Sequence, residues 1–197
     1  MERINVLLVE DDPTWSKCIR KHINRQEDMV VCGEVTNKEE AIEQASNHLV
    51  DVILMDINLT ENNLDGIEAA EEISNMGECK IIMLTSLDQE EIILDSFECG
   101  AINYITKANY KDIPDAVRNA YNNKSSVHFD VANTLLFGFR QAKKENKLNV
   151  LTPEERRVYE LKEEQGLNKS EIAQLLFKSV STVKNQIKKI RQKLDTK

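Results

Sequence analysis

Short apolar runs alternate with longer stretches of helical spacing over the first 122 residues. The runs are rich in β-branched residues and leucine and are bounded by polar residues, a pattern that predicts buried strands. Alternating strands and helices of this length predict successive βαβ units, and therefore an α/β fold with a doubly wound, five-stranded parallel sheet. The predicted strands are 4–9, 29–35, 50–55, 80–85 and 101–106, and the fifth helix is predicted at about 109–122.

Polar side chains stand at the ends of the predicted strands. Asp11 and Asp12 follow the first strand, Asp56 follows the third, Thr85 ends the fourth, and Lys107 follows the fifth. Ligands of doubly wound sheets bind outside the carboxyl ends of the strands, so we expect these groups to converge. Carboxylate oxygens with open positions suit Mg²⁺. The alternative is a solvated loop of acids, but convergence of several strand ends favours the metal site.

The pattern changes after residue 122. Segment 123–150 loses the alternation, and its polar ends predict a linker. The apolar stretch VANTLLFGF in its middle predicts a short packed helix. Residues 151–197 predict helices only, so we expect three parts: 1–122, 123–150 and 151–197.

Capping signals mark the helices of the last part. Thr152 with Glu155, and Asn168 with Glu171, have the spacing of capping boxes, and Ser179 can cap a third helix. That helix has an apolar face at Val183, Ile187, Ile190 and Leu194 and a polar face at Thr182, Lys184, Asn185, Lys188 and Gln192. Two short helices followed by a helix that is basic outward predict a helix-turn-helix DNA reader. A basic surface helix in an ordinary bundle is the alternative.

The charge distribution supports two domains with different partners. Residues 1–149 carry 15 Lys+Arg and 27 Asp+Glu, a net charge of −12, whereas residues 150–197 carry 11 and 7, a net charge of +4. The basic end is compatible with nucleic acid. The scattered cysteines and histidines predict no zinc or redox site. No apolar run approaches the roughly 20 residues of a membrane span, so we expect a cytoplasmic protein without a membrane partner.

The order of several motifs resembles the response regulators of bacterial two-component systems, in the NarL/FixJ (LuxR-type) group. The resemblance rests on VEDD, LMDINL, DGIEA, LTS and YITKA in the first part and on LTPEERRV, GLNKSEIAQLLF and STVKNQIKKIRQKL in the last. It covers nearly the whole chain. It implies a flavodoxin-like receiver domain followed by an all-α, LuxR-type helix-turn-helix domain.

The resemblance also implies roles for the receiver residues. Asp56 is expected to accept a phosphoryl group. Asp11 and Asp12 are expected to bind Mg²⁺ together with Asp56 and the backbone carbonyl of Asn58, and Glu10 is expected to be a bystander. The metal would neutralise charge on the transferring oxygens. Lys107 is expected to pair with a phosphoryl oxygen, Thr85 to hydrogen-bond it, and Tyr104 to be the switch aromatic.

The sequence departs from the family pattern in both domains. The loop from Asp56 to Asp65 is about two residues longer than usual and lacks the proline, Ala108 replaces a common proline after Lys107, and Ser86 replaces a common alanine. In the last part, one residue is inserted near Gln165. Three further positions there depart from the usual residue: Lys162, Lys178 and Gln186.

For the output domain, the resemblance implies binding of double-stranded DNA. Lys184, Lys188 and Lys189 are expected to contact phosphates, and Asn185 and Gln186 to read adenine edges. Thr182 and Gln192 lie on the same predicted face.

The leading hypothesis is a transcription factor controlled by phosphorylation. A sensor histidine kinase would phosphorylate Asp56, alter dimerisation or interdomain contacts, and so control binding of a homodimer to a two-fold site. The alternative is a signalling module whose C-terminal domain binds a protein. An aspartyl-phosphate hydrolase is disfavoured because DINLT lacks the second aspartate of that class. We expect no enzymatic activity beyond phosphoryl acceptance and slow self-dephosphorylation.

Overall fold

A computed structural model describes residues 3–46, 49–60, 64–77, 79–124 and 127–195. The chain divides into two compact units, Met1–Leu136 and Phe137–Lys197, and each is described by itself. None of the helices in these ranges combines the length and the apolar composition that a bilayer span requires.

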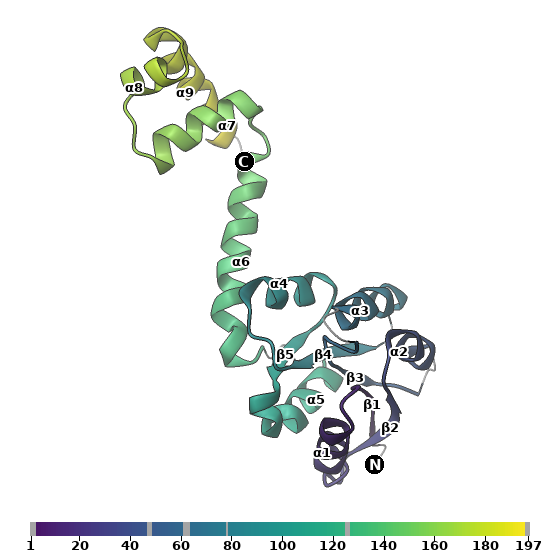
Figure 1. Ribbon diagram of the computed structural model, residues 1–197. Coiled ribbons are helices and arrows are strands. Elements are labelled where there is room, and N and C mark those ends of the chain that lie inside the picture. The colour runs from purple at the N-terminus through teal and green to yellow at the C-terminus, as the bar shows by residue number, and fades with distance from the viewer. Residues whose placement is uncertain (1–2, 47–48, 61–63, 78, 125–126, 196–197) are drawn as a thin grey trace. The chain divides into compact units, whose positions relative to one another are not determined.

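The first unit is built on a parallel sheet with strand order β2-β1-β3-β4-β5 (Figure 1). This confirms the predicted fold, although the third and fifth strands are shorter than predicted. The strands are β1 Ile4–Val9, β2 Met29–Val35, β3 Val52–Met55, β4 Lys80–Thr85 and β5 Asn103–Thr106. The helices are α1 Pro13–Ile23, α2 Lys38–Ala45, α3 Asp65–Met76, α4 Glu90–Glu98 and α5 Ile113–Tyr121.

Alternate residues of each strand face opposite sides of the sheet, and each side has its own core. Leu7 and Val9 belong to the cluster that α2, α3 and α4 cover, whereas Val6 and Leu8 belong to the cluster that α1 and α5 cover. Because both faces of the strands are buried, the strands read as continuous apolar runs rather than as alternating ones.

The fifth helix begins later than the sequence predicts. A 3₁₀ segment, η1, covers Lys107–Asp112, and α5 begins only at Ile113. Pro114 lies in the first turn of α5, where its missing N–H removes no helical hydrogen bond. The predicted start near residue 109 is therefore wrong, and the residues after Lys107 form a separate tight turn.

The segment after the five-stranded sheet contains a longer helix than predicted. Helix α6 runs over Phe129–Leu148, and the boundary between the two units falls inside it. Val131 is buried in the core of the first unit and Leu148 in the core of the second.

The second unit consists of α7 Pro153–Tyr159, η2 Glu160–Glu164, α8 Lys169–Leu175 and α9 Val180–Asp195. Both predicted capping boxes are present, and the Ser179 hydroxyl accepts a hydrogen bond from the backbone N–H of Thr182 at 3.1 Å. The apolar face of α9 packs into the core of this unit through Val183, Ile187 and Ile190.

Element η2 is a π-helical turn at the place where the resemblance to the family implies an inserted residue. The N–H of Gln165 donates to the carbonyl of Glu160 at 3.1 Å, five residues back rather than four. A π turn absorbs one extra residue without ending the helix. Leu161 stays buried and Leu167 stays packed against the core, so the insertion leaves the core intact.

Candidate functional site

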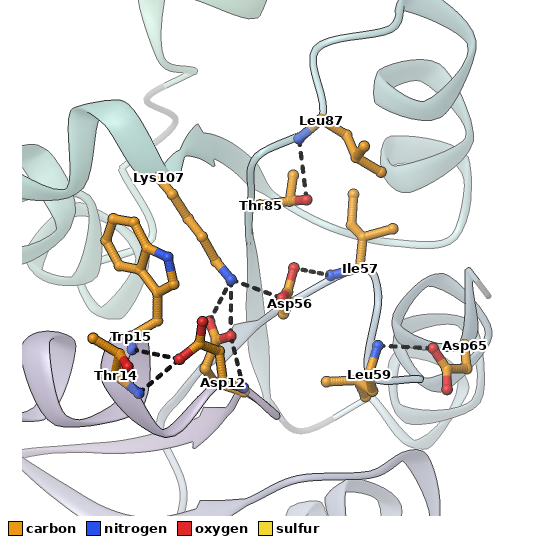
Figure 2. Close-up of polar contacts among 11 residues, drawn as sticks. Asp12, Thr14, Trp15, Asp56, Ile57, Leu59, Asp65, Thr85, Leu87 and Lys107 are labelled. Carbon is orange, nitrogen blue, oxygen red and sulfur yellow. Dashed lines mark hydrogen bonds and ion pairs between the residues drawn. The ribbon is translucent and has the colours of Figure 1, made fainter. Parts of the chain in front are cut away.

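The carboxyl ends of β1, β3, β4 and β5 bring five polar side chains to one edge of the sheet. Figure 2 shows three of them, Asp56, Thr85 and Lys107. Four of the five are buried and one is exposed. The buried ones are Glu10, Asp56, Thr85 and Lys107, each 2 to 6% exposed, and the exposed one is Asp11.

Lys107 links the two buried carboxylates. Its Nζ lies 2.8 Å from Asp56 Oδ2, and 2.8 Å and 2.7 Å from the two carboxylate oxygens of Glu10. Glu10 is therefore part of the site, and the expectation that it is a bystander is wrong. A buried carboxylate of this kind requires a partner because an unpaired buried charge is strongly unfavourable.

The buried charges alter the ionisation of the site. Burial raises the pKa of Glu10 to about 7, the charge of Asp56 adds to this rise, and Lys107 opposes it. Burial by itself would lower the pKa of Lys107, but the hydrogen bonds to Asp56 and Glu10 outweigh it and raise that pKa. The ammonium group therefore stays charged, and a single cation serves two carboxylates.

The three carboxylates that could hold a metal ion are not the three that were predicted from the sequence. Oxygens of Glu10, Asp11 and Asp56 all lie within 4.8 Å of one another. Three carboxylates at this spacing provide the hard oxygen ligands that divalent cations prefer, and Lys107 neutralises only one of their charges. The acidic pair that accompanies Asp56 is thus Glu10 and Asp11, not Asp11 and Asp12.

Asp12 performs a structural task instead. Its Oδ1 accepts hydrogen bonds from the backbone N–H groups of Thr14 at 2.7 Å and Trp15 at 3.3 Å, and so caps α1. The hydrogen bond from Thr14 is the main cause of a lowered pKa of Asp12. Pro13 is the sequence signal for this role, because proline at the first helical position marks the preceding residue as the N-cap.

The loop after β3 positions Asp56 through backbone contacts. The N–H of Ile57 donates to Asp56 Oδ1 at 2.7 Å, and the N–H of Gly66 donates to the carbonyl of Ile57 at 2.9 Å. A Cβ atom at Gly66 would lie 1.9 Å from the backbone oxygen of Asp56, so only glycine allows α3 to begin this close. The carbonyl of Asn58, in the same loop, stays a predicted metal ligand.

Asp65 holds the far end of this loop and was not predicted as a site residue. Its carboxylate accepts hydrogen bonds from the N–H of Leu59 and the hydroxyl of Thr60, both at 3.0 Å. Residues 61–63, which fall in the lengthened part of the loop, lie outside the described ranges.

The side chains of Thr85 and Tyr104 both form hydrogen bonds with the backbone of Leu87. The N–H of Leu87 donates to the Thr85 hydroxyl at 3.3 Å, and the Tyr104 hydroxyl donates to the carbonyl of Leu87 at 2.7 Å. Tyr104 is fully buried, and burial raises its pKa. Ser86 is exposed between Thr85 and Leu87, and the peptide bond between Lys107 and Ala108 is trans.

A second candidate site lies on α9. Its predicted contact residues are exposed, except that Gln186 is half-buried and its Oε1 is buried with no hydrogen-bond partner among the described residues. Gln186 lies three residues after Val183 and four before Ile190, close to the core face, and is not part of the exposed set. The exposed set comprises Thr182, Lys184, Asn185, Lys188, Lys189 and Gln192.

A hollow beside α9 adds two cations that sequence reasoning did not name, Lys169 and Arg191. Together with Lys184 and Lys188 of the same unit, they make four basic side chains that line the hollow. Two departures from the family pattern also have partners. Lys178 pairs with Glu154 at 3.1 Å, and Lys162 donates to the carbonyl of Leu167 at 3.4 Å, at the end of the π turn.

Comparisons with known proteins cover both units. Residues 6–118 match the family described as "Response regulator receiver domain", and residues 145–194 match "Sigma-70, region 4". The transcriptional regulatory protein LiaR of Bacillus subtilis (strain 168) is 34% identical over 98% of this chain and 91% of its own length. The uncharacterized transcriptional regulatory protein YxjL of the same strain is 33% identical over 98% and 89%.

A solved structure shows the same fold. The RcsB response regulator of Salmonella typhimurium is 23% identical, with a TM-score of 0.63, over 100% of this chain and 94% of that one.

Proposed function

Because the chain belongs to the LuxR/NarL-type response regulators, with a receiver domain followed by a helix-turn-helix DNA-binding domain, we propose that phosphorylation of Asp56 controls its DNA binding. The phosphoryl donor would be a sensor histidine kinase, and the protein would act in the cytoplasm. The observation that carries this proposal is the position of Asp56, buried at the strand ends between the Lys107 ammonium and two further carboxylates.

In the transfer step, a carboxylate oxygen of Asp56 attacks the phosphorus on the kinase histidine. The P–O bond forms as the P–N bond breaks, and the imidazole leaves. Lys107 would exchange its contact with Asp56 Oδ2 for one with a phosphoryl oxygen. Glu10, Asp11, Asp56 and the Asn58 carbonyl would hold Mg²⁺, which would neutralise charge between the anionic nucleophile and the phosphoryl oxygens.

The switch would begin at Leu87. If the Thr85 hydroxyl turns to a phosphoryl oxygen, it releases the N–H of Leu87, whose carbonyl holds Tyr104. Phosphorylation would thereby shift an existing equilibrium between two arrangements of this segment.

The start of α6 is placed to respond to that change. Val131 is buried in the same apolar cluster as Tyr104. Asn103, next to Tyr104 on β5, accepts a hydrogen bond from the N–H of His128 at 3.0 Å through its Oδ1. A movement of Tyr104 would therefore disturb the packing of the first turn of α6, the helix that continues into the second unit.

In the DNA-bound state, Lys184, Lys188 and Lys189 would contact phosphates and Asn185 would read a base edge. A single unit of this size offers few contacts, so we propose a homodimer on a two-fold site. The curated relatives are transcriptional regulators, which supports DNA rather than a protein as the partner of the second unit.

The decisive experiment is selection of random DNA duplexes by the purified protein, with Mg²⁺ and with or without beryllofluoride as a phosphoryl mimic. We expect a two-fold motif that the mimic strengthens in the parent and in Asp12→Asn, but not in Asp56→Asn. A motif that all three proteins bind equally would refute control through Asp56. Absence of any motif from folded protein would refute DNA reading.

A further inference from the structure

The aromatic ring of Trp15 lies beside the catalytic ammonium group. Lys107 Nζ is 5.6 Å from the centroid of the ring, within the range of a cation–π contact. Figure 2 shows the indole next to the Lys107 side chain, on the α1 side of the site. From this geometry we propose that Trp15 is a positioning residue that acts through Lys107 during phosphoryl acceptance, an inference that rests on the proposed function.

The helix cap fixes the backbone from which the ring extends, and a second ring packs against it. The backbone N–H of Trp15 donates to the Asp12 carboxylate that caps α1, at 3.3 Å. Tyr110 of η1 packs against the indole edge to face, with ring centroids 6.2 Å apart, and His22 packs against Tyr110 in the same way at 5.5 Å. The indole therefore belongs to a packed row of three rings rather than to a mobile surface side chain.

The position of the ring suits a lysine that must change partners. Lys107 is bound to two carboxylates, and in the proposed transfer it exchanges its contact with Asp56 Oδ2 for one with a phosphoryl oxygen. A further carboxylate in the place of the indole would compete for the ammonium group. An aromatic face attracts the cation without taking one of its hydrogen bonds, and it keeps water away from a largely desolvated charge. Trp15 would therefore keep Lys107 in the site while its N–H groups transfer to the phosphoryl oxygens.

The test measures the rate at which the full-length protein takes a phosphoryl group from phosphoramidate in Mg²⁺, resolved by phosphate-affinity electrophoresis. A small donor is used so that the rate does not depend on how a kinase docks on the receiver. We expect Trp15→Leu, which keeps an apolar side chain without the ring, to slow the reaction roughly 3- to 30-fold. Trp15→Phe, a weaker π partner, should lie between Leu and the parent. Tyr121→Leu, at an exposed ring of α5, should match the parent.

A double-mutant cycle separates positioning from simple structural damage. If Trp15 acts through Lys107, Trp15→Leu should have no further effect in a Lys107→Ala protein. Equal slowing in both backgrounds, or a Trp15→Leu rate within about twofold of the parent, would overturn the inference. A parent that takes no phosphoryl group at Asp56 would overturn the proposed function first, and this outcome is read without any Trp15 variant.

Discussion

The two units handle charge in opposite ways. In the receiver, Glu10, Asp56 and Lys107 are buried and hold one another at 2.7 to 2.8 Å. On α9, Lys184 and Lys188 are exposed and lie with other cations along a hollow. The buried charges are already paired, so a change in one of them obliges the others to rearrange. The exposed charges are solvated and available, so they can meet an anionic partner without internal rearrangement.

This difference assigns a task to each unit. Under the proposed function, a buried, interlocked cluster would respond to a single covalent event with a discrete change, because burial leaves its charges weakly screened. An exposed basic face gives affinity that depends on the number of phosphates met and on salt. Substitutions in the first unit should therefore alter phosphoryl acceptance, and substitutions in the second should alter the affinity for DNA.

The largest effect should come from removing the buried charge of Glu10. Its pKa of about 7 in the folded protein exceeds its ordinary value of 4.5, so the folded state binds this proton more tightly than the unfolded chain. The stability that this group contributes is complete below about pH 4.5 and is lost as pH rises through 7, a loss of up to about 3 kcal/mol. In chelator, the unfolding free energy of the parent should fall relative to Glu10→Gln between pH 5 and 8.

The measurement is urea unfolding followed by Trp15 fluorescence, which reports on the receiver because Trp15 is the only tryptophan. If the unfolding free energies of the parent and of Glu10→Gln change with pH in parallel, the stability of the receiver does not depend on the ionisation of Glu10.

Asp11 and Asp12 provide a matched pair for the metal site. Asp11→Asn removes one of the three clustered carboxylates, and we expect Mg²⁺ affinity to fall about 100-fold or more, since even supporting residues of metal sites are worth 10- to 100-fold. Asp12→Asn should keep the affinity within a few-fold, because asparagine also caps helices. Titration of Trp15 fluorescence with Mg²⁺ measures both, and equal losses would restore Asp12 as a ligand.

The exposed side of the comparison is tested on α9. Replacing Lys184 and Lys188 together by alanine should weaken DNA binding about tenfold or more at low salt and reduce the slope of log affinity against log salt by about 2. Lys193 lies on the same helix but pairs with Glu155 at 2.6 Å, so Lys193→Ala should leave the slope unchanged. Fluorescence anisotropy at several salt concentrations decides this, and an unchanged slope in the double variant would exclude phosphate contacts there.

The smallest expected effect concerns the local stability of the second unit. Asn168 accepts hydrogen bonds from the N–H groups of Ser170 and Glu171 at 2.9 and 3.1 Å. Asn168→Ala should destabilise this unit by about 1 kcal/mol, whereas Asn168→Asp should retain the cap. Circular dichroism should detect the shift, and Trp15 fluorescence should not. A shift in both signals would mean that the two units unfold together.

Local signals explain why much of the architecture was predictable. Capping boxes at Thr152 and Asn168, and the cap at Ser179, depend on residues three apart in the chain, so spacing alone identifies them. The continuous apolar strands identify a sheet that is covered on both faces. The inserted residue near Gln165 was visible only as a departure from the pattern of the resembled family, and only backbone hydrogen bonds show that a π turn absorbs it.

The choice among the three consecutive acids was not predictable in the same way. Glu10, Asp11 and Asp12 have similar chemistry. Pro13 marks Asp12 as the cap of α1, but the sequence does not state whether Glu10 or Asp11 turns toward Lys107. The path of the backbone between β1 and α1 decides which acid faces Lys107. This path places Asp12 at the N-cap of α1 and buries the side chain of Glu10.

The sequence by itself determined the alternation of strands and helices, the capped helices of the second unit, and the convergence of Asp56, Thr85 and Lys107, because these follow from periodicity and from the geometry of parallel sheets. Tertiary structure alone decided that Glu10 shares Lys107 with Asp56, that Gly66 must lack a side chain, and that Trp15 faces the ammonium group. These are contacts between residues far apart in the chain, and they depend on how elements pack rather than on the local preferences of any segment.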